Sequence, residues 1–397
     1  MRKYLLLWVA VWALAIGGSS AFGFSIDSMG VLPNYPGGTD TGGVMNCYAS
    51  YARGLSPDGQ YAVGYSQGDI YWNGVPYETN VPIPVYWSKA TGLVRQHEDW
   101  RHGGWTGVGQ SGKIAGTISD RARYDTIGVD VENDLPPIPI GGNTQCAVAF
   151  SNAVSGNDHW MVGYGVRNYA NKAIRWDSSV YPIPLNAYVT RQGVGASGFG
   201  GVANSGACVG TDRHGTGGGD GAIYWDGASA GVTNIPALAG NVATQGQGIG
   251  ISDNGTYTTG YLSKDAGGYN GFRWSPSDAS SMALVPFGSD TLSWGGDAAD
   301  NGMVAGWTYN PTNSYRVCVW DSDGTPQLLY DFLVSLGVDM SGWQRLTKAY
   351  SITPDGKYIS GYGLTTAGRE EGFVAFIPEP ATMLLLALGG LALRRRR

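Results

Sequence analysis

The chain carries the stretch Gly54-Leu55-Ser56-Pro57-Asp58-Gly59-Gln60-Tyr61-Ala62-Val63-Gly64-Tyr65 and repeats it as Ser351-Ile352-Thr353-Pro354-Asp355-Gly356-Lys357-Tyr358-Ile359-Ser360-Gly361-Tyr362. Each copy predicts two short strands joined by Asp-Gly, a dipeptide that suits tight hairpins with positive φ. Five weaker copies lie between them, and the closing glycines form a series: Gly64, Gly116, Gly163, Gly210, Gly260, Gly306 and Gly361. These glycines are 52, 47, 47, 50, 46 and 55 residues apart, which indicates seven repeated units.

A third predicted strand follows most of these glycines and ends on a large aromatic residue. The residues at this position are Trp87, Trp176, Trp225, Trp274 and Trp320, with Phe376 aligned to them in the last unit. The second unit lacks such a Trp, and a fourth short apolar piece follows in several units. Seven units of four short strands are typical of a β-propeller. The recurring aromatic residues would fill the space between neighbouring blades. The alternative, a β-solenoid, usually has much shorter repeats.

The two ends of the repeat region predict how the ring closes. The last unit stops after its third strand, whereas Phe24–Leu32 offers a spare strand near the N-terminus. We expect this strand to complete the last blade, because closure removes exposed sheet edges. The sequence therefore predicts an all-β, seven-bladed propeller over residues 22–376. One short helix is expected within residues 326–337, where apolar residues recur at helical spacing and face the core.

The composition excludes several other classes of protein. The 64 glycines among 397 residues do not fit a helical bundle, and 12% aromatic residues do not fit a disordered chain. A net charge of −6 argues against a nucleic-acid partner. Four cysteines are few for a disulfide scaffold.

The N-terminus has the pattern of a secretory signal peptide. Basic Met1-Arg2-Lys3 precedes an apolar run to Ile16 and then small residues. We expect residues 1–21 to be removed by cleavage after Ala21, with cleavage after Gly23 as the alternative. A retained membrane anchor is the other interpretation, although the apolar run is short for a span.

The C-terminus has three parts in order. Pro378, Glu379 and Pro380 precede an apolar run over residues 381–393, and Arg394, Arg395, Arg396 and Arg397 follow it. Thirteen apolar residues are marginal for a membrane span, and the arginines favour a cytoplasmic end. A plain tail anchor is one interpretation. The whole tail, residues 377–397, resembles the PEP-CTERM sorting signal of Gram-negative bacteria.

That resemblance implies a processing route. Pro378-Glu379-Pro380 would be recognised by an exosortase, a membrane-embedded cysteine protease. The transmembrane helix would then be removed and the product delivered to the cell surface or extracellular matrix. Such systems tend to accompany exopolysaccharide production, so the resemblance makes exopolysaccharide a candidate partner.

The repeated unit also resembles the HAF-type extracellular repeat. That family's opening is matched by Leu32-Pro33-Asn34-Tyr35-Pro36-Gly37-Gly38-Thr39, with a two-residue insertion, and its hairpin by the stretches quoted above. The His-Ala-Phe that names the family is absent, and Ala173-Ile174-Arg175-Trp176 takes its place. This resemblance implies an extracellular propeller and brings no catalytic residues.

The residues that could carry chemistry are few. The histidines His97, His102, His159 and His214 lack metal-site spacing, so no metal or cofactor is predicted. Residues 95–102 are charged and predict either a solvated connection or a polar site at a blade mouth. The string Gly193–Gly198 matches a dinucleotide fingerprint, but it lies in all-β surroundings where that pattern has no meaning.

Acidic residues and cysteines leave further alternatives open. Asp125, Asp130, Glu132 and Asp134 suggest a long inserted loop that binds cations or sugars or is simply solvated. Cys47 and Cys146 occupy equivalent places two blades apart, too far for the Cα separation that a disulfide requires. Cys208 and Cys318 lie in strand patterns and are expected to be buried thiols, with a disulfide in an oxidising compartment as the alternative.

We expect a non-catalytic role as a structural or binding component of the extracellular matrix, with contact to exopolysaccharide. Membrane contact is expected only through the C-terminal helix before processing. The alternative is a glycan-active lyase or hydrolase on a propeller scaffold, which needs paired acids or a His/Tyr/Arg set at the axis. A self-assembling surface-layer subunit is a third hypothesis.

Overall fold

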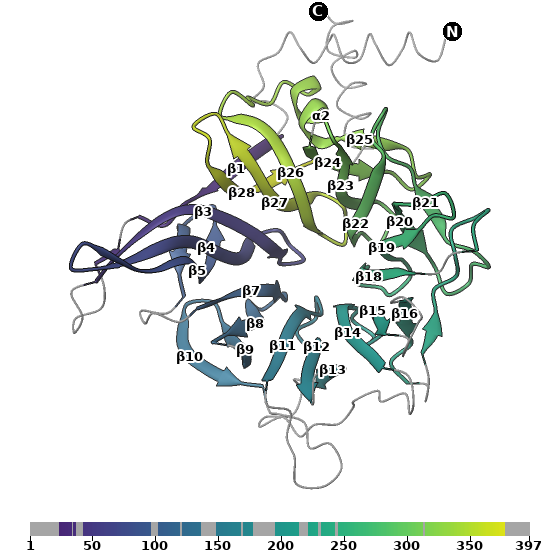
Figure 1. Cartoon of the computed structure of the whole chain (residues 1–397), viewed down its shortest axis with the longest axis horizontal. Helices are drawn as coiled ribbons and strands as arrows, with labels where there is room; N and C mark the ends of the chain where they lie inside the picture. The colour runs from purple at the N-terminus through teal and green to yellow at the C-terminus, as the bar shows by residue number, and fades with distance from the viewer. Residues whose placement is uncertain are drawn as a thin grey trace, which may run out of the picture.

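The computed structural model describes residues 24–377 except 34, 37–42, 97–101, 120, 136–147, 168–169, 178–194, 214–220, 229–231, 243–244 and 313. Within that part of the chain, seven antiparallel sheets surround a central axis as the blades of a propeller (Figure 1). The prediction of an all-β, seven-bladed propeller is confirmed. The predicted signal peptide, the Ala21 cleavage site and the C-terminal sorting signal with its helix lie outside the described residues.

The first four blades follow one another along the chain. Blade 1 contains β2 (Tyr35–Pro36), β3 (Gly43–Leu55), β4 (Tyr61–Trp72), β5 (Val75–Ser88) and β6 (Gly92–Arg95). Blade 2 contains β7 (Gly103–Val108), β8 (Lys113–Ile118), β9 (Arg121–Thr126) and β10 (Val129–Asp134). Blade 3 contains β11 (Val148–Val154), β12 (Trp160–Arg167) and β13 (Ala170–Asp177). Blade 4 contains β14 (Gly195–Val202), β15 (Cys208–Arg213), β16 (Gly221–Trp225) and β17 (Thr233–Asn234).

The last three blades complete the ring. Blade 5 contains β18 (Gly246–Ile251), β19 (Thr258–Ser263), β20 (Tyr269–Trp274) and β21 (Met282–Leu284). Blade 6 contains β22 (Leu292–Ala298), β23 (Val304–Asn310), β24 (Ser314–Trp320) and β25 (Pro326–Leu328). Blade 7 contains β26 (Trp343–Ile352), β27 (Tyr358–Thr365), β28 (Glu370–Phe376) and the N-terminal strand β1 (Ser25–Gly30).

The N-terminal strand closes the propeller as predicted. Strand β1 pairs antiparallel with β28, with Ser25 opposite Phe376 and Ser28 opposite Phe373. The predicted helix is also present as α2 (Leu329–Ser335), between β25 and β26. Its residues Leu329 and Leu333 are buried in the hydrophobic cluster between blades 6 and 7, so its apolar face belongs to the core.

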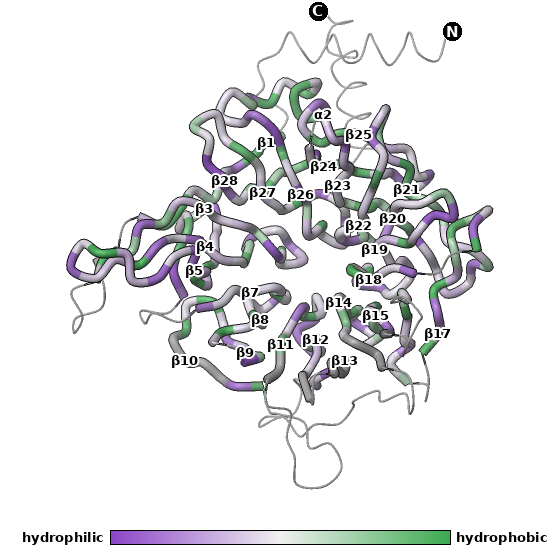
Figure 2. Tube along the Cα trace, viewed as in Figure 1, coloured by the Kyte–Doolittle hydropathy of each residue, from purple (hydrophilic) through white to green (hydrophobic). Residues whose placement is uncertain are grey.

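The hydrophobic core is divided among the blade interfaces. Seven clusters of buried residues each join two neighbouring blades. Figure 2 shows hydrophobic segments recurring around the ring. Five of these clusters contain the Trp that ends the third strand of a blade: Trp87, Trp176, Trp225, Trp274 and Trp320. No helix of the described residues has the length and apolar character needed to cross a membrane.

The seven repeat glycines all face the same kind of obstacle. Each lies on the strand that follows the inner strand of its blade, which in blade 1 is β4 after β3. Each is opposite the residue that precedes a β-bulge in that inner strand. A Cβ placed on these glycines would lie between 1.8 Å (Gly64 to the Tyr51 carbonyl oxygen) and 2.2 Å (Gly116 to the Gly104 carbonyl oxygen) from the inner strand. Only glycine permits this approach, which explains its recurrence.

The alignment of Phe376 with the Trp series needs a correction of one residue. Each Trp pairs with the residue two places before the repeat glycine, as Trp320 pairs with Val304. In blade 7 that place is Ile359, whose partner is Ala375, while Phe376 pairs with Tyr358. The side chains of a strand alternate between faces, so Phe376 lies on the opposite face.

The acidic residues of the second unit are on strands and not in a long loop, which corrects that expectation. Asp125 in β9 pairs with Ile114 and takes the place that Trp has in other blades. It is only 2% exposed, and Gln96 Nε2 donates a hydrogen bond to it. Asp134 in β10 forms ion pairs with Arg121 and Arg123.

Candidate functional site: the central channel

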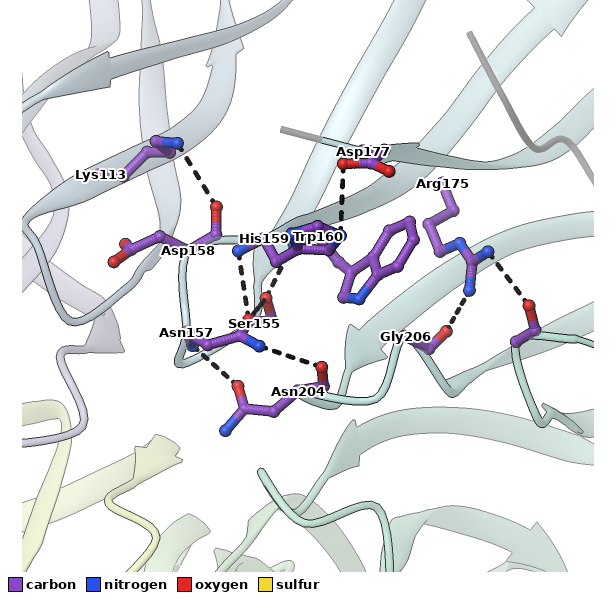
Figure 3. Close-up of polar contacts among 11 residues, drawn as sticks. Lys113, Ser155, Asn157, Asp158, His159, Trp160, Arg175, Asp177, Asn204 and Gly206 are labelled. Atoms are coloured by element: carbon purple, nitrogen blue, oxygen red, sulfur yellow. Dashed lines mark hydrogen bonds and ion pairs between the residues drawn. The ribbon is translucent and has the colours of Figure 1, made fainter. Parts of the chain in front are cut away.

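The hairpins between the first and second strands share one hydrogen-bond pattern in alternate blades. In blade 3, Ser155 Oγ donates to Asn157 Oδ1 at 2.7 Å, and the Trp160 N–H donates to Ser155 Oγ at 2.9 Å (Figure 3). Blades 1, 5 and 7 repeat this pattern with the pairs Ser56–Asp58, Ser252–Asn254 and Thr353–Asp355. The side chains of these turns therefore satisfy the local backbone.

The hairpins also bind one another from blade to blade. The Asn157 N–H donates to Asn204 Oδ1 at 2.8 Å, and Asn157 Nδ2 donates to the Asn204 carbonyl at 3.0 Å (Figure 3). The Asn204 N–H donates to the Asp253 carbonyl, and the Asn254 N–H to Asp300 Oδ1. The Gln110 N–H donates to the Gly156 carbonyl, and the Asp300 N–H donates to the Pro354 carbonyl. With these two links the contacts run from blade 2 to blade 7 and fix one end of the channel; we call them the turn ring.

Inner strands of all seven blades line a cavity of about 620 Å³ on the axis. Each contributes the extra residue of its β-bulge: Arg53, Thr106, Asn152, Gly200, Ile249, Gly296 and Tyr350. Thr106 and Asn152 use their side chains to donate hydrogen bonds to the carbonyls of the next blade. The charged and aromatic bulge residues, Arg53 and Tyr350, both lie where blade 7 meets blade 1.

A continuous series of aromatic rings follows one side of the channel. It comprises, in order, Tyr261, Trp294, Trp307, Tyr350, Tyr362, Tyr51 and Tyr65. Successive ring centres are 6.4, 6.1, 5.8, 6.1, 5.0 and 4.7 Å apart. We call this set the aromatic arc. It extends over blades 5, 6, 7 and 1 and meets the cavity at Trp307 and Tyr350.

On the side of blades 2 to 4, two inner strands carry glycine next to an aromatic ring of the preceding blade. A Cβ on Gly104 of blade 2 would lie 3.0 Å from Tyr65, and one on Gly198 of blade 4 would lie 3.3 Å from Tyr164. At these two places an aromatic ring packs directly onto the glycine of the next inner strand. In blade 3, Tyr164 stacks on Phe150 at 4.7 Å, but this pair is not connected to the seven rings of the arc in the described residues.

Two cations lie on the faces of these rings. The Arg53 guanidinium carbon is 4.0 Å from the centre of the Tyr350 ring. Lys348 Nζ is 4.5 Å from the Tyr315 ring centre and 5.4 Å from that of Trp307. Burial, reinforced by the charge of Arg53, lowers the pKa of Lys348. Such contacts stabilise a partly desolvated cation without neutralising it.

One carboxylate, Glu370, also faces the arc. The Tyr51 hydroxyl donates a hydrogen bond to Glu370. Burial, together with this hydrogen bond to the carboxylate, raises the pKa of Tyr51. Tyr51 therefore stays neutral and acts as a donor at physiological pH.

Two further carboxyl groups line the cavity, and both serve contacts between blades. Asp297 Oδ2 accepts hydrogen bonds from Ser351 Oγ and the Ile352 N–H of blade 7, each at 3.2 Å. Its Oδ1 accepts from the Ala298 N–H, and burial raises its pKa to about 7. Asp253 accepts from Asn204 Nδ2, and burial raises its pKa to about 6.

The other residues singled out from the sequence are dispersed. His102 pairs with Glu78 at 3.2 Å, and His159 pairs with Asp177 at 3.3 Å (Figure 3). His97, His214 and Cys146 lie outside the described residues. In the part of the chain that the structure describes, no three His, Cys, Asp or Glu residues are grouped to hold a metal. Cys208 and Cys318 are buried free thiols, as expected, and Cys47 is a partly buried one.

The aromatic arc and its cations were not foreseen from the sequence. A signal for part of the arc exists, because the residue after the repeat glycine is aromatic in five units: Tyr65, Tyr164, Tyr261, Trp307 and Tyr362. The abundance of Tyr and Trp suits sugar stacking and is equally explained by blade packing, so the sequence does not show which of these residues approach the channel. Arg53 and Lys348 give no such signal, since each occurs in one unit alone.

Fold and sequence together define a β-propeller protein that carries a sorting signal. A family model described as the PEP-CTERM protein-sorting motif matches residues 376–397. This match implies export, exosortase processing and sorting to the cell surface. No curated protein matches the chain.

Solved propellers resemble the fold. The β-propeller domain of the Trilobed protease from Pyrococcus furiosus is 8% identical at a TM-score of 0.50, over 84% of this chain and 96% of that one. The putative TolB from Agrobacterium tumefaciens is 12% identical at a TM-score of 0.41, over 84% and 91%. A puromycin-hydrolysing peptidase from Mycobacterium tuberculosis is 12% identical at a TM-score of 0.49, over 83% of this chain and 53% of that one. At these identities the likeness concerns the fold alone.

Proposed function

We propose that this protein is a surface-sorted, non-catalytic propeller that binds polysaccharide of the extracellular matrix through the aromatic arc. The observation that carries the proposal is the unbroken series of seven rings beside a cavity of about 620 Å³. Ring faces pack on the C–H groups of sugars, while tyrosine hydroxyls and the cations meet sugar oxygens. The repeats are proposed to be HAF-type, on their sequence pattern.

The route to the matrix is part of the same proposal. Residues 1–21 direct export, and the apolar helix within residues 377–397 anchors the chain until an exosortase removes it. The sorting motif at residues 376–397 supports this route. Exopolysaccharide is the polymer that the delivered propeller would meet.

A non-catalytic role is favoured by how the channel carboxylates are used. Asp297, Asp253 and Glu370 are the acids that a glycan-cleaving enzyme could recruit here. Asp297 and Asp253 accept hydrogen bonds from neighbouring blades, and Glu370 accepts one from the Tyr51 hydroxyl. A general acid or base must be free to reach the reacting oxygen. Binding without cleavage is therefore the function that the channel supports best.

Co-sedimentation with exopolysaccharide from the protein's own host tests the proposal. The mature protein should pellet with the polymer and leave its length unchanged. Exchange of two partly exposed rings, Trp294→Leu with Tyr65→Leu, should weaken binding about tenfold. Trp72→Leu is the matched control, since this Trp is 42% exposed at the end of β4.

The other outcomes discriminate the alternatives. No pelleting would reject glycan as the ligand and leave a protein partner or self-assembly. Shortening of the polymer would identify the lyase or hydrolase instead, and loss of that shortening in Asp297→Asn would assign the acid.

A further inference from the structure

We propose that the sugar held at the aromatic arc is acidic, of the uronic acid class, with its carboxylate received by Arg53 and Lys348. This inference rests on the proposed function and narrows it to one class of polymer. The observation behind it is that Arg53 and Lys348 lie on ring faces of the channel without a carboxylate partner among the described residues.

Both cations are oriented but not neutralised. Arg53 and Lys348 lie on ring faces at 4.0 to 5.4 Å, contacts that fix their positions. Within the described residues neither of them forms an ion pair with a carboxylate. Other cations are paired with carboxylates, as Lys89 is with Asp27 and Arg316 with Asp290. A fixed, unpaired cation in a partly buried place is suited to an anion from outside.

The two cations are also close enough to repel each other. The positive charge of Arg53 is one cause of the lowered pKa of Lys348. Glu370 is the carboxylate that offsets them in part, and it is already engaged by the Tyr51 hydroxyl. A ligand carboxylate between Arg53 and Lys348 would relieve this repulsion, whereas a neutral sugar would not.

The chemistry of the two side chains suits a sugar acid. The Arg53 guanidinium can donate two parallel hydrogen bonds to one carboxylate, and Lys348 adds a compact charge. The adjacent rings of Trp307 and Tyr350 would contact the sugar itself. The protein's net charge of −6 disfavours general adhesion to polyanions, so attraction has to be local.

The test uses the full mature protein and one matched pair of probes. The probes are a galacturonic acid oligomer and the same oligomer after reduction of its carboxyl groups. Calorimetry at low salt measures the affinity of the protein for each. We expect the acidic oligomer to bind at least tenfold more tightly. Arg53→Gln and Lys348→Gln should each lower the affinity for the acidic oligomer about tenfold and lower the affinity for the reduced oligomer much less. Lys89→Gln, an exposed cation far from the channel, should change nothing.

A further variant distinguishes a specific effect on binding from a loss of folding. Glu370→Gln removes the competing carboxylate and should strengthen binding of the acidic oligomer severalfold, which no unfolding could do. Equal binding of both oligomers would overturn the acidic assignment and leave the proposed glycan binding intact. Binding of neither oligomer, with retention of host exopolysaccharide, would also overturn it. Binding of no polysaccharide at all would reject the proposed function itself.

Discussion

Arg175 in the third blade donates a hydrogen bond from Nη1 to the carbonyl oxygen of Gly206 in the fourth, at 2.6 Å (Figure 3). Its guanidinium carbon lies 4.0 Å from the ring centre of Trp160 and 4.2 Å from that of Trp225. Arg273 of blade 5 repeats the contact with Gly302 of blade 6. These arginines join an odd-numbered blade to the even-numbered blade that follows.

Replacement of Arg175 should therefore destabilise the propeller. Arg175→Met removes two charge-assisted hydrogen bonds and both ring contacts, so we expect a loss of about 2–4 kcal/mol in the free energy of unfolding. Urea denaturation measures it. Arg121→Met, at a side chain that is 65% exposed, is the control and should cost under about 0.5 kcal/mol. Equal losses of unfolding free energy in the two variants would contradict the proposed role of Arg175 in joining blades 3 and 4.

A Cβ at a repeat glycine should be tolerated far less than one elsewhere. Gly64→Ala would place its Cβ 1.8 Å from the Tyr51 carbonyl oxygen, so the inner strand of blade 1 must move. We expect a loss of at least about 3 kcal/mol or failure to fold. In Gly342→Ala, the added Cβ meets nothing within 4 Å. Thermal unfolding of both variants decides, and similar midpoints would be evidence against the close approach.

The buried carboxyl of Asp297 predicts an unusual dependence of stability on pH. Burial raises its pKa to about 7, above the value of about 3.9 in an unfolded chain. The folded state thus binds this proton more tightly, so the contribution of Asp297 to stability falls as pH rises from about 4 to 7. Asp253, with a pKa of about 6, acts in the same direction.

Denaturant unfolding at several pH values measures this effect. We expect Asp297→Asn to flatten the profile between pH 5 and 8 by about 1–3 kcal/mol relative to the unaltered protein. The comparison uses the slope of the unfolding free energy against pH, because the side-chain amide introduced by Asp297→Asn also changes the hydrogen bonds to Ser351 and Ile352. Parallel profiles would show that Asp297 keeps an ordinary pKa.

Because β1 closes the ring, we expect the stability of the whole propeller to depend on this N-terminal strand. Exchange of residues 25–30 for a Gly-Ser sequence removes the partner of β28 and the buried Met29. We expect the propeller to unfold at a markedly lower denaturant concentration and to expose the edge of β28. Hydrogen exchange should show loss of protection first in β28. Unchanged protection there would mean that blade 7 is stable with three strands.

Repeated features were predictable and single features were not. The spacing of Gly64 and its equivalents revealed seven blades, and the spare strand at Phe24–Leu32 revealed the closure. Phe376 was misaligned by one residue because neither it nor Ala375 is a Trp. The four acids of the second unit were expected in a loop, because the pattern of that blade is weakest there.

The sequence by itself determined the number of blades, the strand hairpins and the sorting tail, because each depends on local spacing and on turn chemistry that neighbouring residues supply. Only the tertiary structure decided where the channel is aromatic and where it is charged. Tyr261, Trp294, Tyr350 and Tyr65 are separated by up to 285 residues, yet their rings belong to one arc. Closure of the ring brings blade 7 against blade 1, and that contact places Arg53 on Tyr350.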